Sequence, residues 1–369
     1  MKIGILTFHR SQNYGALLQA KALQDFVKSL GYEVSFVDYW PDYHEEMYKP
    51  FSWRKFRKYG LKGKVKYVLQ LIFTFNRLNR RRNRTKNYIN NYLNISQDKK
   101  FDLVLYGSDQ IWRKQHQPTY DWFNPVYWGE GYAETQHKVA YAASMGKIEI
   151  DSSEDKSFVK SHLDLFDSVG LREKDLIERL RLEFGIEYPM VCDPVFLLTK
   201  EQWTQHVDKK YIPKKKYILY YRLQNIKATD QMVEELRMKT GDEVIEMRSF
   251  IPLFHYGRKY RFTADAQEFI SLIYGADYVV TSSFHGIALS ILFEKQFFFS
   301  SKINKANRIA SLLNQMGLEK RFSAGKVAEV NTEEIINYDI IKPRVEAFSR
   351  QSRDWLIKQI VDCSSISSC

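Results

Sequence analysis

The six residues from Thr281 to Gly286 (TSSFHG) are of types that bind anions and move protons. They follow an apolar stretch that predicts a strand, and they open a run with helical periodicity. Ser282 or Ser283 can cap such a helix, whose free N–H groups and dipole attract phosphate or carboxylate. Gly286 would let the backbone approach a ligand, and a bound anion would favour a protonated His285 suited to proton transfer. The alternative is a capped helix with a structural histidine.

Arg172 is a second candidate, because it directly follows a predicted strand over 168–171 and precedes a predicted helix. A guanidinium in this position can make a bidentate contact with a carboxylate or phosphate. The alternative is a surface salt bridge with Glu173 or Asp175.

A third set of candidates follows other predicted strands near the start of the chain. Asp109 lies in the stretch GSDQIW and could accept a proton from a sugar hydroxyl, or it could simply cap a turn. Trp112 opens an aromatic-rich region whose rings could stack on sugars or fill the core. Asn13 and Tyr14 lie in a loop of the same strand-end type.

Several common cofactor and metal motifs are absent from the sequence. There is no GxGxxG, no P-loop, no D-x-D pair, no HExxH and no GxSxG. The eight His are scattered and the three Cys have no CxxC spacing, so we expect no metal and no cofactor. What remains suits metal-free chemistry on an anionic ligand.

The net charge of +12 is concentrated in one segment. Between Met47 and Gln97 there are 14 Lys or Arg and no Asp or Glu, which leaves 42 basic residues elsewhere against 44 acidic ones. Within it, residues 65–75 are apolar and flanked by Lys and Arg. Residues 49–86 therefore either contact an anionic membrane or form a solvated basic helix pair. No recognition motif accompanies the charge, so nucleic acid is not expected as a partner.

No run is long and apolar enough to span a membrane, and the first residues do not resemble a signal peptide. We therefore expect a cytoplasmic protein, with peripheral contact at the inner face of the membrane as the alternative for residues 49–86.

The elements that must position these candidates alternate between strand and helix. The first series predicts strands at 3–7, 34–38, 102–106, 139–143, 168–171 and 190–193, and the second predicts strands at 217–221, 243–247, 277–281 and 296–299. Such alternation is typical of parallel sheets covered by helices. We predict two Rossmann-like α/β domains, at 1–195 (with a basic helical insertion at about 48–97) and 196–342. Residues 343–369 should form a helix that ends in a frayed tail from Cys363 to Cys369.

Several of these motifs together resemble the polysaccharide pyruvyl transferases. The matching pieces, in the family's order, are Asn13–Ala20, Gly107–Trp112, Tyr141–Gly146, Leu171–Lys174, Asp193–Pro194, Ser282–Gly286, Arg308 with Leu312–Leu313, and Gly317–Leu318. They span nearly the whole chain. Each is weak alone, and together they are specific for the family but not for one acceptor sugar.

The resemblance implies a GT-B-type arrangement with a central cleft and phosphoenolpyruvate as the donor substrate. The product would be a cyclic pyruvate ketal on a sugar of a surface polysaccharide or its lipid-linked precursor. From it and the residues above, we expect His285 and Asp109 to be catalytic. The expected donor contacts are Arg172, Ser282, Ser283, Phe284, Gly286 and Arg308, and the expected acceptor contacts are Asn13, Tyr14 and Trp112.

The sequence departs from the family at Ser283, where many members carry an Arg that helps to hold the donor. Either the hydroxyl and helix N–H groups replace that Arg, or another cation reaches in. Arg308, Arg222 and Arg248 are the candidates. Two other functions stay open: a nucleotide-sugar glycosyltransferase of the same fold, and a non-catalytic binder of anionic glycans.

Overall fold

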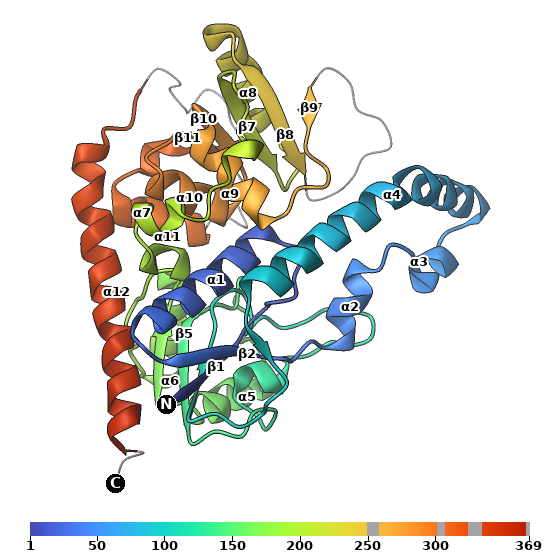
Figure 1. The fold of residues 1–369 in the computed structure, drawn as a ribbon. Coiled ribbons are helices and arrows are strands. Elements are labelled where there is room, and N and C mark those ends of the chain that lie inside the picture. Colours follow the sequence, from blue (N-terminus) through green and yellow to red (C-terminus); the bar gives the residue numbers. More distant parts are fainter. Residues whose placement is uncertain (249–257, 301–306, 324–333, 367–369) are drawn as a thin grey trace.

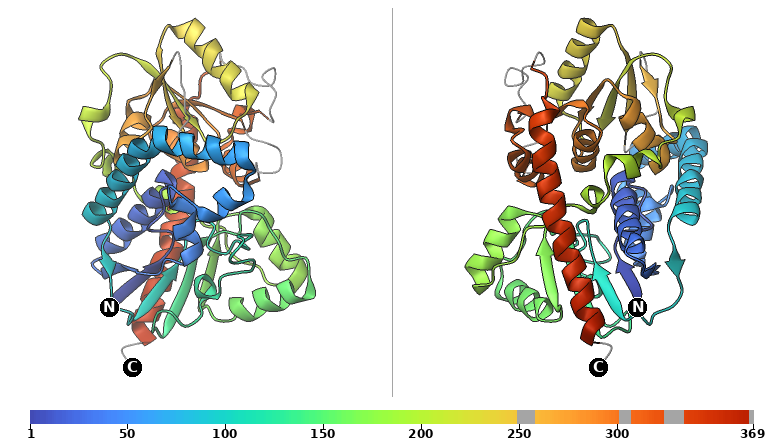
Figure 2. Two further views of the ribbon diagram at one scale, coloured as in Figure 1. Left: turned by 90° about the vertical axis from the view of Figure 1, so that its right-hand side faces the viewer. Right: turned by 60° about the vertical axis from the view of Figure 1, so that its left-hand side comes forward.

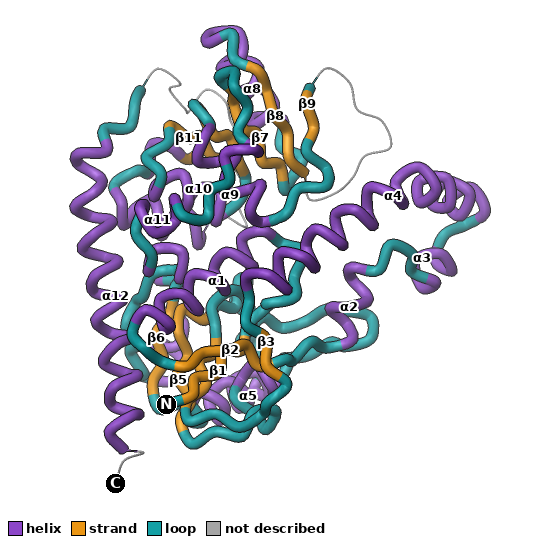
Figure 3. The backbone as a smooth tube through the Cα atoms, viewed as in Figure 1, coloured by secondary structure: helices purple, strands orange, loops and turns teal. Residues whose placement is uncertain are grey.

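The computed structural model describes residues 1–248, 258–300, 307–323 and 334–366 (Figure 1). These residues form two α/β domains, each built on a six-stranded parallel sheet with helices on both faces (Figure 3). The predicted fold class of two Rossmann-like domains is therefore confirmed.

The N-terminal sheet has the strand order β3-β2-β1-β4-β5-β6. Its strands are β1 (Lys2–Leu6), β2 (Glu33–Val37), β3 (Ile95–Ser96), β4 (Leu103–Tyr106), β5 (His137–Ala143) and β6 (Ser168–Leu171). Most of their residues are apolar and buried, as expected for parallel strands covered on both faces. The strand predicted at 190–193 does not form, because Met190 makes only an isolated bridge with Leu171.

The C-terminal sheet repeats this topology with the order β12-β11-β10-β7-β8-β9. Its strands are β7 (Tyr217–Arg222), β8 (Glu243–Arg248), β9 (Lys259–Tyr260), β10 (Tyr278–Thr281), β11 (Gln296–Ser300) and β12 (Phe322–Ser323). Counted from each sheet's first strand, both orders read 3-2-1-4-5-6, the doubly wound order whose ligands bind at the carboxyl ends of the strands.

The helices around the sheets follow the predicted apolar periodicity. In the N-terminal domain they are α1 (Tyr14–Ser29), α5 (Ser153–Leu163) and α6 (Lys174–Phe184). In the second half they are α7 (Lys200–Thr204), α8 (Lys227–Thr240), α9 (Ala266–Gly275), α10 (Phe284–Leu292) and α11 (Asn307–Met316). Helix α1 is buried almost all round because it packs on its own sheet and on α9 and α10 of the other domain.

The last helix, α12 (Tyr338–Ile366), runs along both domains (Figure 1). Near its start Arg344 donates to the carbonyl of Met316 in the C-terminal domain, and further along Ser352 accepts from the backbone N–H of Cys192. It begins before Pro343, where we had predicted its start. The frayed tail is also corrected, because Cys363 is buried in the helix; residues 367–369 lie outside the described chain.

The basic insertion forms α3 (Trp53–Lys58) and the long α4 (Leu61–Tyr92), and the short α2 (Asp42–Tyr48) precedes it. The first half of α4 projects with α3 away from the two domains, and its second half lies across α1 toward α9 (Figures 1 and 2). Among the residues that the structure describes, no helix has both the length and the apolar character needed to cross a membrane.

Candidate active site

Arg172 and His285 meet at one buried carboxylate between the two domains. Arg172 follows β6 and its Nη1 donates to Oδ2 of Asp193, while Nε2 of His285 lies 3.5 Å from the same oxygen. The other oxygen of Asp193 accepts from the backbone N–H of Val195, which fixes the carboxylate at the start of the short helix η2 (Pro194–Leu197). A guanidinium from one domain and an imidazole from the other therefore contact the same carboxylate, beyond the carboxyl ends of β6 and β10.

The charges of this cluster are strongly coupled. Burial acts to raise the pKa of Asp193, but the imidazole of His285 and the guanidinium of Arg172 outweigh it and hold the pKa well below its usual range. Burial acts to lower the pKa of Arg172, and Glu173, Asp193 and Asp109 reverse that effect. Asp193 and Arg172 are therefore both ionised across the physiological pH range.

The start of α10 fixes the position of His285. Ser283 is the N-cap, and its hydroxyl accepts from the N–H of Gly286 at 3.3 Å. The Ser282 hydroxyl accepts from the N–H of Leu223 at the end of β7. Both hydroxyls therefore already have backbone partners. The added Cβ of an alanine at Gly286 would lie 2.8 Å from Oγ1 of Thr281, so this glycine serves packing of the helix on β10.

His285 also packs against the first turn of α1. A Cβ added at Gly15 would lie 2.1 Å from Nδ1 of His285, so only glycine admits the ring here. The neighbouring Phe284 places its ring 4.9 Å from the guanidinium of Arg172, a cation–π contact across the domains. Nε2 of His285 is buried and makes no hydrogen bond within the described residues, and the Asp193 carboxylate lies 3.5 Å away from it.

Asp109 and Asn13 border this cluster but serve first as local caps. The side chain of Asp109 accepts from the N–H of Gln110, and its residue adopts φ = 71° after β4. It is close enough to raise the pKa of Arg172. Asn13 is exposed and caps α1 by accepting from the N–H of Gly15 at 3.0 Å.

Tyr14 and Trp112 are corrected as acceptor contacts, because both side chains are core residues. Tyr14 packs against Tyr221 and Phe269 and lies under the guanidinium of Arg81. Trp112 is fully buried, stacks on Trp128 with ring centroids 4.4 Å apart, and donates to the carbonyl of Tyr127. The sequence could not separate rings that face solvent from rings that fill the interior.

A model of the family described as polysaccharide pyruvyl transferase matches residues 13–301, most of the chain. The chain belongs to the polysaccharide pyruvyl transferase family. No curated protein sequence matches it significantly.

Solved structures similar to this pyruvyl transferase family member share its two-domain architecture. The glycosyltransferase SnogD from Streptomyces nogalater has a TM-score of 0.46 and 9% identity, with 98% of this chain and 99% of that chain covered. UDP-GlcNAc 2-epimerase from Neisseria meningitidis has a TM-score of 0.48 and 10% identity, with 98% of this chain and 100% of that chain covered. The E. coli heptosyltransferase WaaC gives 0.41 and 10%, covering 94% and 100%. In this chain both domains are doubly wound.

Two of the three cations considered as substitutes for the family's Arg at Ser283 are already paired. Arg222 donates to Asp230, and Arg248 donates to the buried Glu246. The Arg308 side chain lies outside the described residues, so that expectation stays a prediction.

A groove between the domains leads toward Arg172. Lys174, Asp175 and Glu178 of α6 line it together with residues of α11, and its volume is about 460 Å³. It shares Met190, Ser311 and Gln315 with a cavity of about 10 Å³ beside Arg172 and Asp193. That cavity holds about one water molecule, so this conformation is closed around the cluster.

A larger cleft lies at the carboxyl side of β1 and β2 in the N-terminal domain. Its volume is about 1800 Å³, and it is lined by aromatic and charged side chains including Arg10, Trp40, Tyr43, Arg57, Tyr120 and Tyr132. Such a lining suits saccharides, whose apolar faces stack on rings and whose hydroxyls bind charged groups. The sequence predicts an aromatic-rich region here, but the residue that we expected to contact the acceptor, Trp112, is buried.

Sequence reasoning missed Asp193 as a site residue. Its signal was the Asp193–Pro194 pair after an apolar stretch, one of the pieces that match the family. It missed Gly15 as well, because the close approach of His285 joins residues from different domains.

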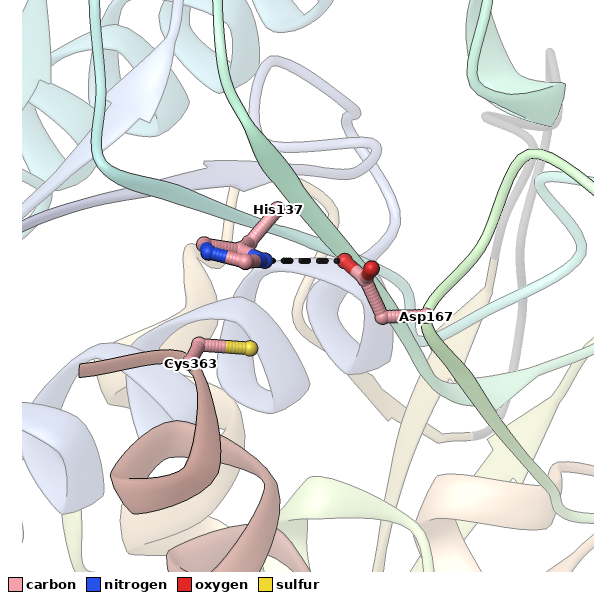
Figure 4. A group of neighbouring side chains, drawn as sticks. All are labelled: His137, Asp167 and Cys363. Carbon is pink, nitrogen blue, oxygen red and sulfur yellow. Dashed lines mark ion pairs between the residues drawn. The ribbon is translucent and has the colours of Figure 1, made fainter. Parts of the chain in front are cut away.

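Within the part of the chain that the structure describes, one group of side chains brings possible metal ligands within 4.8 Å of one another: His137, Asp167 and Cys363, at the amino ends of β5 and β6 and on α12 (Figure 4). Nδ1 of His137 lies 3.4 Å from Asp167, which an ordinary ion pair explains. Burial raises the pKa of the Cys363 thiol to about 11, so the thiolate that a metal needs is disfavoured. The group lies at the edge of the sheet opposite Arg172.

Proposed function

We propose that this protein transfers the enolpyruvyl group of phosphoenolpyruvate to a sugar of a surface polysaccharide or its lipid-linked precursor. The product is a cyclic pyruvate ketal, and phosphate is released. One observation carries the proposal: Arg172 and His285, from different domains, converge on Asp193 and can therefore grip the same small anion. Membership of the family supports a transferase of this kind.

In the proposed reaction, protonated His285 gives its proton to the methylene carbon of phosphoenolpyruvate, which makes C2 electrophilic. One sugar hydroxyl adds to C2 and loses its proton to the now neutral imidazole. A second hydroxyl of the sugar then attacks C2 and loses its proton to Asp109 or water. The bond between C2 and the phosphate oxygen breaks, and phosphate leaves with the electron pair of that bond. Arg172 and the N–H groups that open α10 balance the negative charge of the donor.

Donor binding requires the closed cluster to widen. Arg172 is neutralised by Asp193 and Glu173, and the adjoining cavity has room for about one water. The donor's carboxylate or phosphate would replace Asp193 as the partner of Arg172. We propose that the donor enters along the groove between α6 and α11, where Lys174 supplies the second cation.

The acceptor saccharide is proposed to lie in the aromatic cleft of the N-terminal domain. Arg10 in its wall follows β1, and Arg172 follows β6 at the same edge of the sheet. Between them β4 is followed by Ser108 and Asp109, and the Ser108 hydroxyl accepts from Arg172. A chain of sugars in the cleft could thus present a terminal residue toward Asp109.

The test is phosphate release from phosphoenolpyruvate with a panel of lipid-linked saccharides, followed by detection of the ketal in the product. We expect release only when both a donor and an accepted saccharide are present. Thermal stabilisation by nucleoside diphosphates but not by phosphoenolpyruvate would favour the nucleotide-sugar glycosyltransferase instead. Binding of phosphoenolpyruvate and saccharide with no phosphate release would favour a non-catalytic glycan binder.

A further inference from the structure

An arm formed by α3 and the first half of α4 projects from the two domains (Figures 1 and 2). It exposes a stripe of large apolar side chains. On α4 the stripe consists of Leu61, Val65, Val68, Ile72 and Phe75, whose three- and four-residue intervals place them on one face of the helix. Leu69 and Phe73 widen it. Leu61 is 82% exposed, Ile72 65% and Phe73 62%, which is unusual for large apolar side chains on one helix.

The stripe is not the packing face of the arm. The opposite face of α4 presents Tyr67, whose hydroxyl accepts from the backbone N–H of Ser52 and whose ring lies near those of Phe51, Phe56 and Tyr59. This aromatic cluster holds α3 against α4. The packing of α3 on α4 therefore does not cover the apolar stripe, which stays exposed to solvent.

Basic side chains flank the stripe and no acidic side chain interrupts it. Lys62 and Lys66 on α4 are exposed, and the sequence has no Asp or Glu from Tyr48 to Gln97. An apolar face bordered by cations is complementary to a bilayer surface with anionic headgroups. Long lysine side chains can keep their ammonium groups at phosphate level while their stems lie along apolar surface.

We propose that this arm docks the protein on the surface of a phospholipid bilayer that contains anionic lipids. The stripe from Leu61 to Phe75 enters the boundary between headgroups and acyl chains, and Lys62 and Lys66 contact lipid phosphates. A second copy of the chain is a poorer occupant, because a symmetric contact would bring two purely basic segments together. This inference stands apart from the proposed reaction.

The same helix joins the arm to both domains. In its second half, Arg81 is buried and donates to the carbonyls of Gln12 and Arg248, one in each domain. Arg84 pairs with Asp265 and Glu268 of the C-terminal domain. Docking of the arm would therefore orient the cleft between the domains relative to the membrane.

The experiment is flotation of the full-length protein with vesicles of phosphatidylcholine, with or without phosphatidylglycerol. Two variants test the surface: Lys62→Gln with Lys66→Gln for the charge, and Ile72→Asn with Phe73→Asn for the stripe. Two matched controls change similar exposed residues elsewhere, namely Lys214→Gln with Lys215→Gln, and Leu182→Asn. Circular dichroism and analytical ultracentrifugation check folding and oligomeric state.

We expect wild-type protein and both controls to float with the anionic vesicles, and less as salt is raised. The charge variant should bind roughly 25-fold more weakly, since ~1 kcal/mol per lysine at an anionic surface is about five-fold. The stripe variant should lose at least about ten-fold through lost apolar burial. Failure of the wild type to float, or unchanged binding in both folded variants, would overturn the proposal. If the wild type does not float but is a dimer, and the stripe variant is a monomer, a second copy of the chain would instead be the occupant.

Discussion

Asp193 gives the proposed site its charge balance at the scale of single residues. One oxygen faces both Arg172 and His285, where the donor anion is proposed to bind. In the proposed reaction the donor would have to compete with this carboxylate for Arg172. This arrangement would keep the cationic pocket stable when it is empty.

Replacing His285 with alanine should reduce kcat by about 10²- to 10⁴-fold, the usual contribution of a positioned acid or base. The fold should survive, because the side chain caps no helix. Steady-state phosphate release and thermal unfolding measure the two effects. His206→Ala is the matched control, since His206 pairs with Asp25 at a distance from the site. Wild-type turnover in the His285 variant would contradict the assigned role.

Replacing Asp193 with asparagine should lower the free energy of unfolding by about 3 kcal/mol or more, because it leaves Arg172 buried with less compensation. The pKa of Asp193 is depressed in the folded protein, so its contribution is present above about pH 4 and is lost as the pH falls toward the folded pKa. Urea unfolding at several pH values measures the gap between variant and wild type.

The difference in free energy of unfolding between the wild type and the Asp193 variant should be constant from about pH 8 to pH 5 and narrow below about pH 4. Asp151→Asn, a change at a highly exposed carboxylate, should shift stability by less than about 0.5 kcal/mol. A gap that opens only at acid pH would show that Asp193 is not the ionised partner of Arg172.

At the scale of elements, the first turns of α1 and α10 determine each other's position. Asn13 and Ser283 cap the two helices, and His285 of one fits against Gly15 of the other. Short polar caps and a glycine thus bring two helix N-termini together between the domains. The positive ends of both dipoles then face the region where the donor anion is proposed to bind.

Gly15→Ala should displace His285 and abolish most of the activity, since the new methyl group would overlap the ring. Stability should fall as well, by about 1–3 kcal/mol for an overpacked site. The destabilisation should shrink when the change is made in the His285→Ala background, where the ring is absent. Equal costs in both backgrounds would mean that the close approach does not constrain the helices.

Lys174→Gln should raise the KM for phosphoenolpyruvate about ten-fold or less while leaving kcat nearly unchanged, because a groove cation assists entry and binding rather than chemistry. Steady-state kinetics with varied donor separate the two constants. Lys160→Gln on the exposed face of α5 is the control. A fall in kcat with unchanged KM would remove Lys174 from the donor path.

On the scale of the whole molecule, α4 and α12 both tie the two domains together. The two halves of the insertion, which we expected to be solvated or to face a membrane, differ in their contacts. Its first half is exposed, and in its second half Arg81 and Arg84 contact the opposite domain. If the domains separate to open the cluster of Arg172, Asp193 and His285, as proposed for donor binding, the contacts of α4 and α12 would oppose that movement.

Arg84→Gln should lower the free energy of unfolding by about 2 kcal/mol, as charge-assisted hydrogen bonds contribute roughly 1.5–3 kcal/mol each and this side chain is partly exposed. Urea denaturation measures the loss. The neighbouring Arg82 is exposed, and Arg82→Gln should have little effect. Equal effects of the two substitutions would show that Arg84 does not hold the domains together.

The sequence alone determined the two α/β halves and the family, because buried parallel strands, glycine caps and helical periodicity are local patterns. It also placed Arg172 and Ser282–Gly286 at strand ends, where doubly wound sheets bind ligands. Only the tertiary structure decided that Arg172, Asp193 and His285 meet, that Tyr14 and Trp112 are core residues, and which half of the basic segment is exposed. These properties depend on contacts between residues far apart in the chain, and a linear pattern carries no information about which buried faces meet.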